Sequence, residues 1–193
     1  MNKLALFACL AAATLITTGC VTGRRSIELA VPTAQTAVPA SKGTVALAAV
    51  TDQRRFEKAP KVPSTPSING DLDKTSKESL STMIGRQRNT FGAAMGDVAL
   101  AGGETVQGRV RALVEQGMKR HGYTPVSGGT ADATADVAIN KFWAWGTPGF
   151  SSIDFEAEVS TDISLNRGGA VKTITVNGYG KNSGQVASDA NWQ

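Results

Sequence analysis

The strongest constraint on the fold is an alternation of apolar and polar residues near the C-terminus. Over residues 155–165 almost every second side chain is apolar, and the side chains between them are polar or acidic. A strand with one wet face is typical of antiparallel sheets. Residues 166–169, Asn-Arg-Gly-Gly, then have the composition of a hairpin turn, and residues 171–180 supply the returning strand. The pattern therefore predicts an antiparallel hairpin with one solvated face.

One long helix is predicted for residues 104–121. Gly122 suits the left-handed position that ends a helix, and the cationic residues before it suit the helix C-terminus. We therefore expect His121 to be a capping residue, because it has no acid or nucleophile at a catalytic spacing. The residues of the apolar face share helical spacing and are Val106, Val110, Leu113, Val114, Gly117 and Met118.

Further strands are predicted for residues 43–50, 123–126 and 136–145. The first of these is apolar on both faces and belongs inside a sheet that a helix covers on at least one side. A last helix starts with Ser188 as its N-cap and stops at Gln193, which suggests a truncated C-terminal helix. The predicted class is α+β, with a largely antiparallel sheet and helix packed on one face.

Residues 56–103 are predicted to be an irregular insertion in a single domain that covers residues 43–193. Pro60, Pro63 and Pro66 recur at three-residue spacing, which suits a polyproline stretch and forbids a helix there. The remainder of the insertion is polar or rich in glycine. A segment of this length without regular structure is more often functional or disordered than decorative.

Two pairs of charged residues are candidates for binding an anion or a partner. Asp52 and Arg54 follow the first predicted strand, at the end where α/β folds often place functional groups. The structural alternative is that Asp52 caps the turn or pairs with Arg54 or Arg55. Arg86 and Arg88 lie in a glycine-containing stretch, and guanidinium groups pair bidentately with phosphate or carboxylate. The alternative there is a solvated loop, since no known phosphate-binding motif is present.

Trp143 and Trp145 are candidates for an aromatic contact. Residues two apart on a strand point to the same side, so the two rings could stack on a sugar or a lipid chain. The alternative is that both rings fill the core beneath a helix. Val137 and Ile139 are predicted to share their face, with Lys141 as a misplaced charge that either a bulge or snorkelling of its side chain would resolve.

Composition excludes many enzyme classes. The two cysteines are Cys9 and Cys20, and His121 is the single histidine. With so few ligands we predict no catalytic residue, no metal site and no cofactor. The formal net charge of +4 comes from scattered basic residues, which does not indicate a nucleic-acid partner.

The N-terminus has the layout of a bacterial secretory signal. Lys3 precedes an apolar run over residues 4–16, which is too short to span a bilayer. Small residues then lead to Cys20, and this ending resembles the lipobox of bacterial lipoproteins. In that family the signal, here residues 1–19, is removed and the cysteine is acylated. The alternative is an ordinary signal cut nearby. Residues 20–42 are predicted to be a lipidated tether with a reach of roughly 70 Å. Within it, apolar and polar side chains alternate over residues 26–31, as in an edge strand.

The chain also resembles the YajG-like envelope lipoproteins. The resemblance rests on residues 17–20, on the strand and Asp-Gln-Arg run of residues 45–54, on residues 118–123, Met-Lys-Arg-His-Gly-Tyr, and on the hairpin end at 176–179. It implies a non-enzymatic lipoprotein of Gram-negative bacteria with no catalytic residues to transfer. Val21 after the cysteine implies an outer-membrane location facing the periplasm.

Two functions follow as hypotheses. The first is a lipid-anchored binding or assembly module that docks an envelope protein through a sheet edge or through residues 56–103. The second is a ligand-binding or hydrolytic domain that uses Asp52 and the Arg86 and Arg88 pair. A weaker third is recognition of cell-wall glycan by the two tryptophans.

Overall fold

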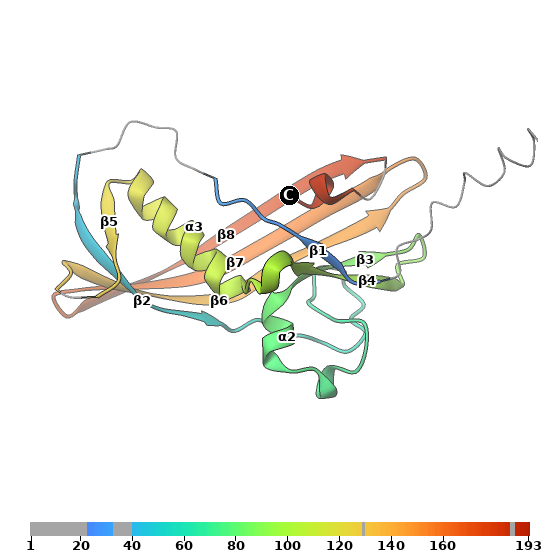
Figure 1. The fold of residues 1–193 in the computed structure, drawn as a ribbon, viewed down its shortest axis with the longest axis horizontal. Coiled ribbons are helices and arrows are strands. Elements are labelled where there is room, and N and C mark those ends of the chain that lie inside the picture. Colours follow the sequence, from blue (N-terminus) through green and yellow to red (C-terminus); the bar gives the residue numbers. More distant parts are fainter. Residues whose placement is uncertain (1–22, 33–39, 129, 186–187) are drawn as a thin grey trace, which may run out of the picture.

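The chain builds one eight-stranded mixed sheet in the computed structural model, which describes residues 23–32, 40–128, 130–185 and 188–193 (Figure 1). The two α-helices are α2 (Lys77–Thr82) and α3 (Val106–Arg120), and short 3-10 helices cover Leu72–Lys74, Ala101–Gly103 and Asp189–Trp192. The strands are β1 (Arg25–Ile27), β2 (Gly43–Asp52), β3 (Met83–Arg88), β4 (Ala94–Leu100), β5 (Tyr123–Val126), β6 (Ala133–Pro148), β7 (Ile153–Arg167) and β8 (Ala170–Gly184).

Strand β6 organises the sheet because it is long enough to pair with three neighbours. Along one edge its first half pairs with β2 and its second half with β3, while β7 follows its other edge throughout. Strand β5 flanks β2, strands β4 and β1 follow β3, and β8 flanks β7. Each of the outer strands β1, β5 and β8 therefore lies at an edge.

The α+β class is confirmed, but the prediction of a largely antiparallel sheet is wrong. Four of the seven strand pairings are parallel, namely β1 with β4, β2 with β5, β2 with β6, and β3 with β6. The alternation at residues 155–165 describes only the hairpin and its pairing with β6. Parallel pairs need long crossover connections, and no local pattern marks which distant strands those crossovers bring together.

The prediction of an irregular insertion at residues 56–103 is also wrong, because this segment supplies α2 and two strands of the sheet, β3 and β4. Gly85 of β3 explains part of the error. A Cβ atom there would lie 2.5 Å from the carbonyl oxygen of Ala144, so the glycine permits close approach to β6. Arg86 and Arg88 are buried, which further disguises the strand.

The hairpin is confirmed as β7 and β8. Gly168 and Gly169 form its turn with φ of 58° and 86°, both left-handed values that favour glycine. The solvated face carries cross-strand hydrogen bonds, as from Tyr179 to Glu156 at 2.6 Å. The alternating pattern therefore located this hairpin and its polar face correctly.

Helix α3 is confirmed, with its ends as expected to within two residues. The hydroxyl of Thr105 accepts a hydrogen bond from the amide of Gly108 at 3.1 Å and caps the N-terminus. His121 occupies the C-cap position, and Gly122 follows with φ of 84°. The apolar face buries Val106 and Val110 against the sheet.

Two apolar clusters lie on opposite faces of β6, which has a bulge between Ile139 and Lys141. Val137 and Ile139 belong to the cluster beneath α3. Trp143 and Trp145 belong to the second cluster, which residues from the segment before β3 cover. A bulge was one of the two expected solutions, but the four side chains do not share one face, because the extra residue reverses the alternation.

The described part of the predicted tether lies against the sheet. Strand β1 pairs in parallel with β4 and buries Ile27 at 2% exposure. An edge strand is therefore present, starting one residue before the predicted range of 26–31. Cys20 and residues 33–39 lie outside the described residues. At the other end Ser188 precedes the short 3-10 helix, whose Trp192 packs on Phe155 at 5.1 Å between ring centroids.

Candidate functional site

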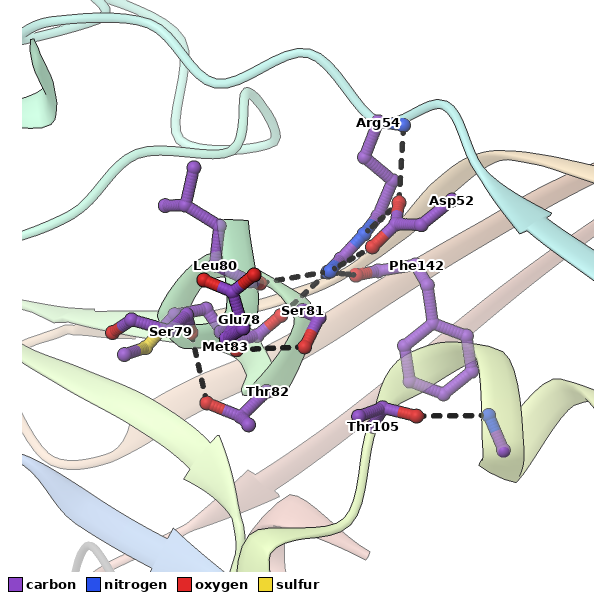
Figure 2. A network of polar contacts seen from close by, with 11 residues as sticks. Asp52, Arg54, Glu78, Ser79, Leu80, Ser81, Thr82, Met83, Thr105 and Phe142 are labelled. Carbon is purple, nitrogen blue, oxygen red and sulfur yellow. Dashed lines mark hydrogen bonds and ion pairs between the residues drawn. The ribbon is translucent and has the colours of Figure 1, made fainter. Parts of the chain in front are cut away.

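Asp52 and Arg54 form a buried network that joins four elements (Figure 2). The Arg54 Nε and Nη2 atoms donate to the two carboxylate oxygens of Asp52 at 2.8 and 2.7 Å. Nη2 also donates to the carbonyl of Leu80 at 3.1 Å, and Nη1 donates to the carbonyls of Met83 and Phe142. The Arg54 side chain has 0% exposure.

This network matches the structural alternative for Asp52. All five N–H groups of the Arg54 guanidinium have acceptors within the protein, so none remains for a bound anion. The pair instead ties the end of β2 to α2, β3 and β6. Arg55 beside it is exposed.

Arg86 lies on β3, and not in a solvated loop. Its Nη1 donates to the hydroxyl of Ser67 and to the carbonyl of Ile68, and its Nε lies 3.7 Å from a carboxylate oxygen of Asp97 on β4. Burial lowers the pKa of Arg86, and the Asp97 charge opposes that shift. Burial likewise raises the pKa of Asp97, against the hydrogen bond that it accepts from the Asn69 amide.

The structure does not bring Asp52 and Arg86 to one cavity. The cavity beside Arg86 has a volume of about 350 Å³ and also exposes the carboxylates of Glu57 and Asp71. Asp52 does not line it. Arg88 donates to the carbonyl of Gly92 at 2.9 Å, and burial lowers its pKa. Lys58 also lines this cavity, so its two acids and two cations leave no excess positive charge for an anion.

Trp143 and Trp145 are buried, with 1% and 6% exposure. The Trp143 indole N–H donates to the carbonyl of Pro63 at 3.3 Å, and the ring meets Phe56 edge-on at 5.8 Å between centroids. The Trp145 indole donates to Glu156 at 3.0 Å. These contacts match the core alternative, although the cover over the rings is the segment before β3.

An apolar groove that no sequence motif indicated lies between α3 and the β7–β8 hairpin. We call it the α3–β8 groove. Its volume is about 650 Å³, and its lining includes Arg167 and Lys172 beside the turn of the hairpin. The apolar side chains that define it come from the helix and from both strands and are Val114, Met118, Ile163, Leu165, Ile174 and Val176.

The groove exists because one helix cannot cover the whole width of the sheet. Helix α3 contacts mainly β2 and β5, so the apolar face of β7 and β8 extends beyond it. Leu165, Ile174 and Val176 are 38%, 47% and 46% exposed. Grouped apolar side chains with this exposure mark interaction sites more often than chance.

Positive side chains stand at the turn end of the groove. Lys42, Arg167 and Lys172 line it together with one acid, Asp132. The Asp132 carboxylate accepts hydrogen bonds from the amide and hydroxyl of Thr44 at 2.7 and 2.9 Å, which lower its pKa. The charge of Arg167 also acts on Asp132 and lowers its pKa, but three cations and one acid line this end of the groove, so it keeps a net positive charge.

The groove was missed because its parts were predicted separately. The alternation at residues 155–165 indicated an apolar strand face, and the helical spacing indicated one apolar helix face. A comparison of the apolar area of the strands with that of the helix could have revealed the groove. A single amphipathic helix is too narrow to cover the hairpin as well as β2. Within the described ranges, no three His, Cys, Asp or Glu residues are placed to hold a metal ion.

No helix in the described part of the chain is both long and apolar enough to cross a bilayer. No family model matches the sequence. No curated protein matches it either.

Similar solved structures are only distantly alike. One is an uncharacterized protein with 10% identity and a TM-score of 0.38, covering 82% of this chain and 79% of that one. Another is a Xanthomonas campestris protein of the DUF330 family with 12% identity and a TM-score of 0.40, covering 88% and 82%. Likeness at this level carries no information on function, and the YajG-like resemblance stays a prediction.

Proposed function

We propose that this chain is a lipid-anchored, periplasm-facing envelope protein that works as a non-enzymatic binding module, with the α3–β8 groove as its binding surface. The observation that carries this proposal is the half-exposed apolar face of β7 and β8, on which Ile174 is 47% exposed. Exposing this much aliphatic surface to water is unfavourable. A ligand or partner that covers it gains that free energy.

Binding is a better account of the groove than catalysis. The middle of the groove is aliphatic, and its one carboxylate, Asp132, is held by Thr44. General acid–base or nucleophilic catalysis needs a titratable group within reach of a second one. His121, the C-cap of α3, also lines the groove, but among the described residues no hydrogen bond or ion pair joins its imidazole to Asp132. The charged residues first considered for hydrolysis lie elsewhere: Arg54 has no free donor, and Arg86 lines a different cavity.

The cellular location of the protein is proposed from its N-terminal sequence. We expect mass spectrometry of the mature chain from cells to show Cys20 as the first residue, carrying a diacylglycerol and an acylated amine. The Cys20→Ala variant should then be released from the membrane fraction. An unmodified N-terminus at any other residue would contradict the anchor and the outer-membrane location together.

The role of the groove can be tested in cells with two matched substitutions on β8. Ile174 faces the groove, whereas Val171 lies an odd number of residues away and faces the opposite side of the sheet. We expect Ile174→Asp to fail in complementing a deletion strain, because a carboxylate in the groove must be desolvated by any apolar ligand.

The control for this experiment is Val171→Asp, which puts the same charge on the same strand at a residue that is 65% exposed. We expect it to complement fully. Both variants should accumulate to the wild-type level, measured by immunoblot. Full complementation by Ile174→Asp would remove the groove from the function of the protein.

A further inference from the structure

The groove combines an apolar channel with a cationic end, and this combination points to one class of ligand. Resting on the proposed binding role of the groove, we infer that the α3–β8 groove binds a long-chain fatty acid. The acyl chain lies between α3 and the hairpin, and the carboxylate meets Arg167 and Lys172 near the turn.

The apolar part of the groove suits an acyl chain. Its volume of about 650 Å³ falls within the roughly 300–1,000 Å³ of typical small-molecule sites. The floor is formed by cross-strand neighbours, with Ile163 opposite Ile174. Val114 and Met118 of α3 form the wall. A flexible chain needs no hydrogen bonds, and this part of the groove offers few.

Strand register places the cations on the same face as the apolar floor. Lys172 pairs with Leu165, and Leu165 lines the groove, so the Lys172 side chain leaves β8 on the groove side. Arg167 is two residues beyond Leu165 on β7 and shares its face. A guanidinium and an ammonium at one end of an apolar channel complement a single anionic head group.

The neighbouring acid offsets only part of the positive charge at this end. Lys42 adds a third positive charge, with its Nζ 5.8 Å from the centre of the Tyr123 ring. Asp132 is the acid that lines the groove, and two hydrogen bonds from Thr44 already satisfy its carboxylate. An incoming carboxylate therefore meets a net positive charge.

The test is calorimetric titration of the mature chain with Cys20→Ala, a change outside the described residues, using palmitate and 1-hexadecanol as probes. We expect palmitate to bind one per chain and hexadecanol to bind about tenfold more weakly, because it lacks the charge-assisted contacts. The double variant Arg167→Gln/Lys172→Gln should weaken palmitate by about tenfold or more and leave hexadecanol unchanged.

The Gly117→Leu variant tests whether blocking the groove lowers palmitate affinity without destabilising the fold. Gly117 lines the groove on α3, and a Cβ atom there would meet nothing within 4 Å. Leucine is a far better helix former than glycine, so the midpoint of thermal unfolding should not fall while palmitate affinity drops at least tenfold, an estimate for an occluded apolar site. Val171→Asp serves again as the control and should bind palmitate like the unchanged protein.

Three results would overturn the inference: no binding of palmitate, equal affinity for palmitate and hexadecanol, or unchanged palmitate binding in Gly117→Leu. Dimerisation abolished by Ile174→Asp would identify a second copy as the occupant and overturn it as well. The proposed function fails separately. If palmitate does not bind but Ile174→Asp still fails in cells, the groove keeps its role and loses only this ligand.

Discussion

Replacing Arg54 with alanine should lower the free energy of unfolding by about 3–5 kcal/mol, the usual cost of removing one member of a buried ion pair. The substitution leaves the Asp52 carboxylate, which is 14% exposed, without its countercharge. It also leaves the carbonyls of Leu80, Met83 and Phe142 without this donor. The loss should be measured as a shift in the midpoint of urea denaturation with an unchanged slope.

Arg55→Ala is the matched control, because Arg55 is adjacent in sequence and exposed. It should change stability by no more than about 0.5 kcal/mol. Arg54→Lys keeps the positive charge but cannot reproduce the planar set of five donors. Its stability should therefore lie between those of Arg54→Ala and Arg55→Ala. A cost for Arg54→Ala equal to that of Arg55→Ala would show that the network does not hold these elements together.

Trp143→Ala should cost about 3–5 kcal/mol, as is typical for truncation of a buried tryptophan. Trp143 is the largest of the fully buried side chains and packs with Phe56, Ile68 and Met83 in the second apolar cluster. Its loss leaves a cavity between β6 and the segment before β3. Limited proteolysis should therefore cut that segment faster, in addition to the lower unfolding midpoint.

Phe150→Ala is the control for this prediction, since Phe150 is fully exposed, and it should change stability by no more than about 0.5 kcal/mol. Acrylamide quenching gives an independent check. All three tryptophans, Trp143, Trp145 and Trp192, are buried, so the folded protein should be quenched far less than the urea-unfolded chain. Strong quenching of the folded protein, or a neutral Trp143→Ala, would contradict the core role and revive the glycan hypothesis.

Local patterns in the sequence identified the elements that local physics determines. The helix end at His121 and Gly122 and the glycines at 168 and 169 act over a few residues, so α3 and the hairpin could be predicted. The N-cap at Thr105 was not identified. A charged residue at Lys141 interrupts an apolar face, which indicated either a bulge or a snorkelling side chain, and the structure has the bulge. Its consequence for Trp143 was missed, since one extra residue reverses the sides of every residue after it.

The elements that were missed depend on partners far away in the chain. Arg86 was predicted to lie in a solvated loop, since an arginine is rarely buried without partners. Its partners, Asp97 on the neighbouring strand with Ser67 and Ile68, stabilise the buried guanidinium and cannot be identified from the local sequence. The Arg54 network likewise joins residues up to 88 positions apart. The groove depends on how much of a sheet one helix can cover, which is a property of the assembled fold.

The pairing of β1 with β4 has a consequence for reach. Because the sheet already includes Arg25, only five peptide steps separate it from Cys20, and five steps extend at most about 17 Å. If Cys20 carries the acyl chains proposed above, the folded body lies within about 17 Å of its anchor, and not at the end of a long tether.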